Sequence, residues 1–239
     1  MRSLFRSFER FGVEYLLVGG QASIAYGAAT FSEDVDIWVR PESRNVRRLL
    51  KALAALRARV YKLTPPLTRA FLLAGHSFHF EVPGRPLPIY LDVLGRPPRV
   101  GPFGAARARA RRMATGMGRL PIVSIEDLVA LKLTRRLSDY EVISNLVLLR
   151  LDEEAAPDRA ILKWAARHSF RAEDRRDILR RLGATCTLAQ CRRRIAAEVV
   201  ALQARDTAYW RRRIGVLRRL RQADRLLPQG VPVARLVAP

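Results

Sequence analysis

Residues 18–39 read VGGQASIAYGAATFSEDVDIWV and contain the most informative pattern in the sequence. A short apolar run ends in Gly19 and Gly20, and a second apolar run carries Asp34 and Asp36 on either side of one valine. The first run predicts a buried strand that stops at the glycines, and the residues after them predict a helix. DVDIWV predicts a second strand, on which the two aspartates project from one face because side chains alternate along a strand.

Two carboxylates held side by side on a strand repel each other unless a cation lies between them. Oxygen ligands at this spacing suit Mg²⁺, which takes further ligands from water and substrate phosphates. A third aspartate, Asp92, is the one charged residue in the apolar run IYLDVL. If that run is a strand beside DVDIWV, three aspartates converge, as two-metal phosphoryl transfer requires. We therefore expect Asp34, Asp36 and Asp92 to hold two Mg²⁺ ions; the alternative is exposed residues at strand ends.

The glycines predict the other half of such a site. Gly19 and Gly20 place no side chains on the turn after the first strand, so backbone N–H groups there can approach phosphates. A helix that begins just beyond adds its positive N-terminal end. We expect this turn to bind the triphosphate of a nucleotide.

The rest of the chain predicts an α/β half, residues 1–124, followed by a helical half, residues 125–239. In the first half, the apolar spacing predicts a helix over residues 2–11 and another capped by Ser43. The runs FHFEV, IYLDVL and LPIVS predict further strands. His76 and His79 are three apart in a predicted strand and so face opposite sides, which argues against a histidine metal pair.

The composition predicts a polyanionic partner. The chain has 239 residues with 44 Lys+Arg against 22 Asp+Glu, a formal charge of +22. A GC-rich coding bias would explain arginine over lysine but not base over acid. Two cysteines are too few for a disulfide framework, and no signal peptide or uninterrupted apolar span is present. We expect a cytoplasmic protein that does not associate with membranes.

Arginines are concentrated in two segments. No acidic residue occurs from Val93 to Ile125, and we expect part of this segment to lie beside the aspartates. From Arg171 to Arg225 there are sixteen arginines and six carboxylates, so the helical half is basic around much of its circumference. Such charge tracks a phosphate backbone without reading sequence. The residues assigned to RNA binding are Arg107, Arg109, Arg111, Arg112, Arg211, Arg212 and Arg213.

The order strand, Gly-Gly, helix, Asp-x-Asp strand and later strand aspartate resembles the nucleotidyltransferase superfamily, which has the DNA polymerase β fold. Within it, VGGQASIAYG…DVDIWV and PIVSIEDLVALKL…SDYEVISNL are most similar to the abortive-infection type bacterial nucleotidyltransferases, many of which are toxins of toxin–antitoxin pairs. The resemblance covers roughly residues 10–150. It implies an α+β fold in which a mixed-sheet nucleotidyltransferase domain, residues 1–124, precedes a basic helical domain, residues 125–239.

The resemblance also implies roles for single residues. Gly19 and Gly20 would bind phosphate, the three aspartates Mg²⁺, and Lys132 the triphosphate, with Asp139 at the acidic position that follows this lysine. Many relatives carry Arg-x-Thr before the aspartate pair, whereas this chain has Thr30-Phe31-Ser32. Ser32 keeps a hydroxyl and is assigned to nucleotide binding, but one phosphate or acceptor contact is missing. The alternatives are a solvated Lys132 and an Asp139 that caps a helix.

These patterns predict a Mg²⁺-dependent transfer of NMP from an NTP to an acceptor hydroxyl, with RNA, plausibly a tRNA end, as the acceptor. A toxin with this activity would also have a cognate antitoxin. One alternative keeps the chemistry and changes the acceptor to a protein side chain or a cationic antibiotic, against which the charge of +22 argues. The other is a catalytically silent, basic RNA-binding or antitoxin-like protein that uses the fold as a scaffold.

Overall fold

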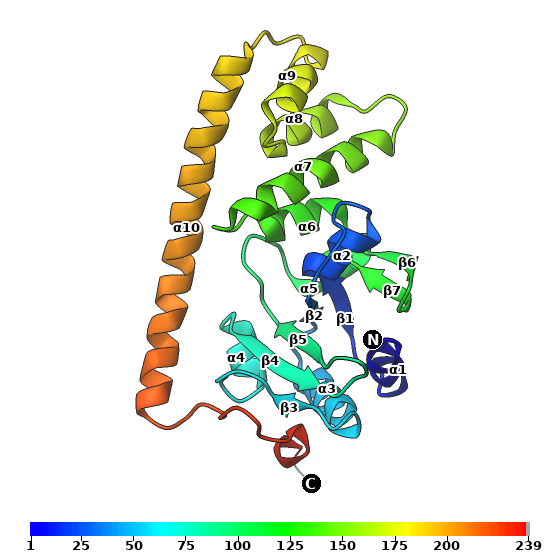
Figure 1. Cartoon of the computed structure of the whole chain (residues 1–239), viewed down its shortest axis with the longest axis vertical. Helices are drawn as coiled ribbons and strands as arrows, with labels where there is room; N and C mark the ends of the chain where they lie inside the picture. Colours follow the sequence, from blue (N-terminus) through cyan, green and yellow to red (C-terminus); the bar gives the residue numbers. More distant parts are fainter. Residues whose placement is uncertain (238–239) are drawn as a thin grey trace.

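The computed structural model describes residues 1–237 and is a mixed α+β structure with one seven-stranded sheet in that range (Figure 1). The strands are β1 (Tyr15–Val18), β2 (Asp34–Val39), β3 (Arg59–Val60), β4 (Ser77–Val82), β5 (Ile89–Leu94), β6 (Arg111–Thr115) and β7 (Gly118–Ile122). Their order across the sheet is β3-β4-β5-β2-β1-β7-β6. β2 is parallel to β5 and β1 to β7, whereas the other neighbours are antiparallel.

The helices connect these strands and then continue alone to the end of the chain. They are α1 (Arg2–Arg10), α2 (Gly19–Ala25), α3 (Ser43–Ala55), α4 (Arg69–Leu73), α5 (Phe103–Arg109), α6 (Ile125–Lys132), α7 (Leu137–Asp152), α8 (Arg159–His168), α9 (Ala172–Arg181), α10 (Leu188–Gln222) and the 3₁₀ helix η1 (Val233–Leu236). None of the helices described is long and apolar enough to cross a membrane.

Alternating burial explains why the predicted strands form. Along β4 and β5 every second side chain is buried, so one face joins the core and the other stays partly open. On β2 the alternation leaves Asp34 and Asp36 on the open face while Val35 and Ile37 enter the core. Two strands, β3 and β6, were not predicted, because β3 is very short and β6 is rich in arginine. The cap assigned to Ser43 is wrong: α3 starts at Ser43, its N-cap residue is Glu42, and no side chain bonds the helix end.

The second half is a stack of helices that ends in one long return. Helices α6 to α9 pack on one another in chain order, and α10 then runs back along the whole length of the molecule (Figure 1). A capping box, in which Thr187 and Gln190 bond each other's backbone, fixes the start of α10. The predicted division at residue 124 falls between the end of β7 and the start of α6.

The segment after α10 packs against the first half. The backbone N–H of Gly230 donates to the carbonyl of Val60 at 2.8 Å, and that of Val60 donates to the carbonyl of Val231 at 2.9 Å. Val233 is fully buried, in the short helix η1 that packs on α3. α10 is therefore anchored to α9 at one end and to the sheet domain at the other, and it stands as a wall opposite β4 and β5.

Candidate active site

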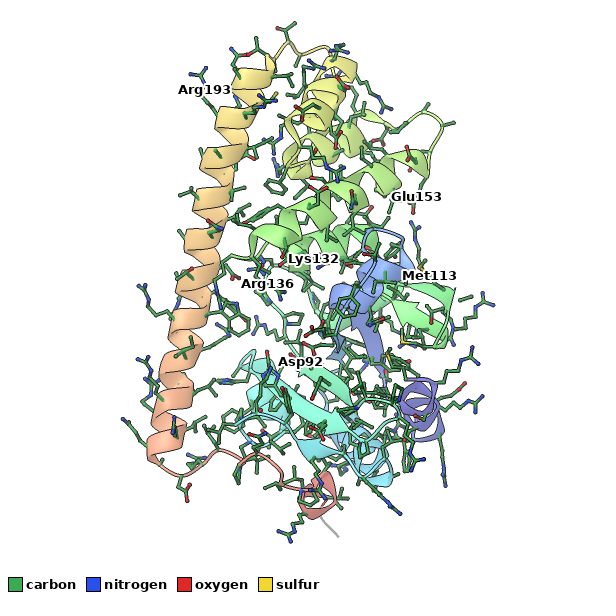
Figure 2. The ribbon with its side chains drawn as sticks, viewed as in Figure 1. Asp92, Met113, Lys132, Arg136, Glu153 and Arg193 are labelled. Carbon is green, nitrogen blue, oxygen red and sulfur yellow. The ribbon has the colours of Figure 1, made fainter. Side chains whose placement is uncertain are left out.

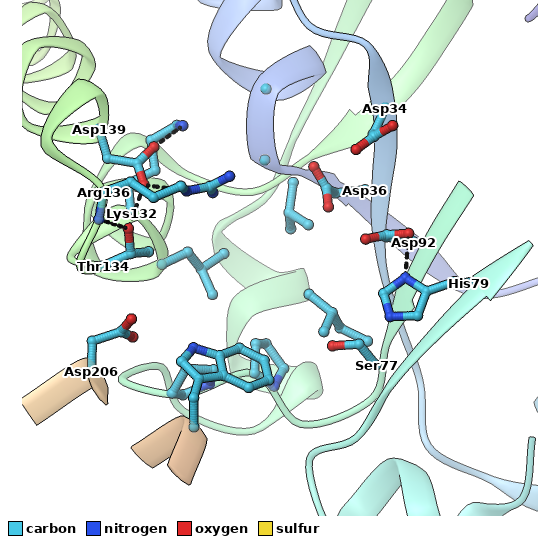
Figure 3. Close-up of a pocket in the computed structure, with 18 of the residues that line it drawn as sticks. Asp34, Asp36, Ser77, His79, Asp92, Lys132, Thr134, Arg136, Asp139 and Asp206 are labelled. Atoms are coloured by element: carbon cyan, nitrogen blue, oxygen red, sulfur yellow. Dashed lines mark hydrogen bonds and ion pairs between the residues drawn. The ribbon is translucent and has the colours of Figure 1, made fainter. Parts of the chain in front are cut away.

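The three aspartates meet on neighbouring strands. In the parallel pair β2–β5, Asp36 lies directly opposite Asp92, and Asp34 is two residues away on the same face (Figure 3). Adjacent strands are about 4.8 Å apart, so these carboxylates share one wall of a cavity. The prediction that Asp92 lies on a strand beside DVDIWV is confirmed.

The carboxylates raise one another's pKa. Burial, followed by the charges of Asp92 and Asp34, raises the pKa of Asp36 from its ordinary value to about 7. Burial and then the charge of Asp92 also raise the pKa of Asp34. Hard oxygen donors under mutual repulsion suit a divalent cation, which would relieve it. Residues 1–237 contain no group of three His, Cys, Asp or Glu side chains already disposed as a metal-ligand set. The chemistry of the donors therefore fits Mg²⁺ without defining its geometry.

The two glycines are required by close approach to the aspartate wall. Gly19 has a φ of +66°, and a Cβ on it would lie 1.9 Å from Oδ2 of Asp36. A Cβ on Gly20 would lie 2.2 Å from Oγ of Ser32. The helix expected to follow the glycines includes them instead, since α2 begins at Gly19. The hydroxyl of Ser32 donates to the carbonyl of Asp34 at 3.1 Å, which ties the turn before β2 to the same wall.

Lys132 and Asp139 face the aspartates from the helical side (Figure 3). Lys132 Nζ donates to Asp139 Oδ1 at 3.0 Å, and both side chains are nearly buried. Thr134 Oγ1 and Arg136 Nε donate to the other carboxylate oxygen at 2.5 and 3.2 Å. Burial raises the pKa of Asp139, but the Lys132 ammonium and these donors outweigh it and hold the pKa below its usual range. Lys132 is thus not a solvated lysine, and Asp139 does not cap α7, whose N-cap is Arg136.

His79 is part of the site, although the sequence reasoning set it aside. Its Nδ1 lies 2.7 Å from Asp92 Oδ1, across the antiparallel pair β4–β5 in which the two residues are direct partners. An ionised carboxylate only accepts, so the His79 tautomer that stabilises an ionised Asp92 has its proton on Nδ1 and donates it. His79 is on the open face of β4, between the buried Phe78 and Phe80. That alternation was visible in the sequence, but the register that pairs His79 with Asp92 was not.

Because His79 orients the Asp92 carboxylate, we expect His79→Ala to weaken Mn²⁺ binding by about 10- to 100-fold, the usual cost of losing a hydrogen-bond partner of a metal ligand. Isothermal titration with Mn²⁺ and no nucleotide measures this effect. Ser77→Ala is the control, since Ser77 is on the same strand and face and also lines the cavity. Equal Mn²⁺ affinity in His79→Ala and the wild type would contradict the role.

The aspartate wall and the Lys132 wall belong to one cavity of about 840 Å³, closed on a third side by α10. Asp206, Trp210, Arg213 and Leu217 line it from α10, at the spacing of one helix face. Asp206 is buried and accepts from Arg99 Nη1 at 2.9 Å, which fixes α10 against the loop after β5. The cavity therefore lies between the sheet on one side and, on the other, the first helices of the helical half, α6 and α7, together with its last helix, α10.

The predicted RNA-binding arginines separate into different environments. Arg109 forms an ion pair with Asp127, and Arg111 with Glu153. Arg213 lines the cavity, where it donates to the carbonyl of Gly75 and lies over the Tyr209 ring. The two arginines before it in the triplet, Arg211 and Arg212, are exposed.

The expectation that part of the acid-free segment lies beside the aspartates is confirmed for its first residues, since Leu94, Pro97, Pro98 and Arg99 line the same cavity. Of its arginines only Arg99 lines the cavity, while Arg107 and Arg112 line a separate groove. The physical reason is that α5 leads the chain to β6 at the far edge of the sheet, beyond β1 and β7. Figure 2 shows Met113 on β6 and Glu153, the residue just after α7, at the flank opposite α10, whereas Asp92, Lys132 and Arg136 lie on the side toward α10.

No protein-family model matches the chain, and a search of curated proteins gave no match. Among solved structures, JHP933 from Helicobacter pylori is similar over 90% of this chain and 94% of its own, with 12% identity and a TM-score of 0.43. ANT(2″)-Ia, solved in complex with adenylyl-2″-tobramycin, is similar over 87% of this chain and 95% of its own, with 16% identity and a TM-score of 0.38. Both likenesses are distant.

Proposed function

We propose that this protein is a Mg²⁺-dependent nucleotidyltransferase that moves NMP from an NTP to a hydroxyl of RNA. The observation that carries the proposal is the wall of three aspartates on β2 and β5, with Lys132 facing it across the cavity. Asp34 and Asp36 would hold two Mg²⁺ ions, and Asp92 would complete the second site. When bound, these ions supply charge neutralisation at the transferring phosphate and lower the pKa of the attacking hydroxyl.

The side chains of this site have distinct tasks. The acceptor hydroxyl attacks the α-phosphorus, a phosphodiester forms, and pyrophosphate leaves. Asp92, held by His79, accepts the hydroxyl proton. Lys132 binds the triphosphate, oriented by Asp139, and Gly19 and Gly20 leave room for the phosphates beside Asp36.

The lining of the cavity has six carboxylates and five cations, and all five cations lie on the helical side, where they favour an anionic acceptor. On the walls made by the helical half and the loop after β5, five cations accompany two carboxylates, Asp139 and Asp206. Both carboxylates are paired, Asp139 with Lys132 and Asp206 with Arg99. A cationic antibiotic would need free acidic side chains there. We therefore propose RNA as the acceptor. The sequence resemblance adds a more specific version, in which the acceptor is a tRNA end and the protein is a toxin with a cognate antitoxin.

The test is incubation of the purified protein with each α-³²P-labelled NTP and total cellular RNA. Label is expected on RNA. EDTA should abolish the labelling, because without metal ions the charge of the phosphates is not neutralised beside the three carboxylates. Omitting RNA should abolish it as well. Label on the protein itself, or on an aminoglycoside supplied in place of RNA, would show that RNA is not the acceptor. Absence of transfer with every NTP and every acceptor would overturn the enzyme assignment.

A further inference from the structure

A second concavity lies at the other flank of the sheet domain. It is a groove of about 480 Å³ between α1, the start of β1 and the hairpin β6–β7. Tyr15, at the first residue of β1, lines it, whereas Val18, at the last, lines the aspartate cavity. The two concavities share no lining residue.

The groove gathers arginines from four elements. Arg2 and Arg6 lie one turn apart on α1, and the others come from α5, β6 and β7. All five are exposed. The full set is Arg2, Arg6, Arg107, Arg112 and Arg119. Arginines brought together from separate parts of the chain are not explained as the solvated stripe of one helix.

None of these five arginines forms an ion pair within residues 1–237, in contrast to Arg109 and Arg111 nearby. Two glutamates, Glu9 and Glu14, also line the groove. Glu14 forms an ion pair at 2.8 Å with Arg40, which is not one of the five arginines. Glu9 is left to offset five positive charges. Concave, water-exposed cationic surfaces focus the field and attract anions.

We infer that this groove binds the phosphodiester backbone of RNA, as a docking site separate from the aspartate cavity. Repeated charge from four elements suits a ligand with repeated phosphates, and backbone contacts of this kind position RNA without reading its sequence. A membrane surface fits poorly, because it cannot enter a concavity and the large apolar side chains here are buried (Phe5, Val13, Leu120) or half-buried (Met117). The inference does not depend on nucleotidyl transfer.

The experiment compares RNA affinity as a function of salt for the wild type and two triple variants, by fluorescence anisotropy of an RNA hairpin in EDTA without NTP. The groove variant is Arg6→Gln, Arg112→Gln and Arg119→Gln, whose side chains make no hydrogen bond to residues 1–237. Each lost phosphate contact should reduce the slope of log K against log salt by roughly 0.7 to 0.9, so the slope should fall by about 2 to 3. Affinity at moderate salt should drop by at least tenfold.

The matched control removes the same charge from the exposed face of α3 in the same domain. It is Arg44→Gln, Arg47→Gln and Lys51→Gln, all exposed on α3. We expect it to change the slope by less than one unit. Equal losses of RNA affinity in the two variants would overturn the groove as a specific site. Displacement of RNA from the groove by ATP, at concentrations that leave binding at the control surface unaffected, would also overturn it, because it would indicate a site for small anions. Loss of RNA binding in the groove variant supports the inference even if no transfer activity is found.

Discussion

Replacing Asp36 by asparagine is expected to reduce nucleotidyl transfer by about 10³-fold or more, since loss of metal-borne charge stabilisation costs several kcal/mol and each 1.36 kcal/mol is tenfold in rate. The same change should leave the metal-free protein at least as stable. Asp36 is crowded by Asp34 and Asp92, and burial with these charges raises its pKa to about 7. An amide fits the same space without the charge.

Two measurements separate the site role from a folding defect. Thermal unfolding in EDTA at alkaline pH should show Asp36→Asn more stable than the wild type, by a few degrees for a gain of about 1 kcal/mol. Added Mg²⁺ should raise the Tm of the wild type and not that of the variant, because a ligand stabilises only the state that binds it. Asp152→Asn, at an exposed position at the end of α7, is the control. Near wild-type transfer by Asp36→Asn would refute the assignment of the aspartates.

Much of the aspartate wall is local in the sequence. The faces of Asp34 and Asp36 follow from strand alternation alone, and the glycine turn follows from the loss of side chains after an apolar run. Asp92 needed one further condition, that its strand pairs with β2, and the charge isolated in an apolar run pointed to it. The faces of Asp34 and Asp36 and the glycine turn could be predicted because each depends on neighbours within a few residues, whereas the place of Asp92 depended on a strand pairing between distant segments.

The pairing of His79 with Asp92 could not be predicted, because it depends on the register between two strands. Two residues on the open faces of two strands become partners only once the β4–β5 connection sets the register. The spacing of His79 from His76 along the chain carries no information about a partner that lies on another strand.

The arginines show the same limit more strongly. Arg109 and Arg111 looked like free cations in an acid-free segment, but their partners Asp127 and Glu153 are 18 and 42 residues away. The line of Asp206, Trp210 and Arg213 was readable as one face of a helix, yet what that face meets depends on the chain after α10 returning to β3. Charge composition predicts that a partner would be polyanionic, and only the packing shows which arginines are exposed and unpaired within residues 1–237.

Substitution of Gly19 by alanine should damage activity by about 10²-fold, because roughly 1 Å of misplacement at a reacting centre has effects of this size. The new Cβ would lie 1.9 Å from Oδ2 of Asp36, so the carboxylate or the turn must move. Gly19 also has a φ of +66°, a left-handed conformation that costs a residue with a side chain about 1–2 kcal/mol. Lost stability alone would therefore be a competing explanation for lost activity.

Gly27→Ala removes that ambiguity. Gly27 lies just past the other end of α2, has a φ of +82°, and a Cβ there meets nothing within 4 Å. It should lose about the same 1–2 kcal/mol from backbone strain, measured by denaturant unfolding, and keep its transfer rate. Mn²⁺ affinity should fall in Gly19→Ala and not in Gly27→Ala, since only the first displaces Asp36. If both variants lost activity equally, strain in α2 rather than contact with the aspartate wall would account for the requirement for glycine at residue 19.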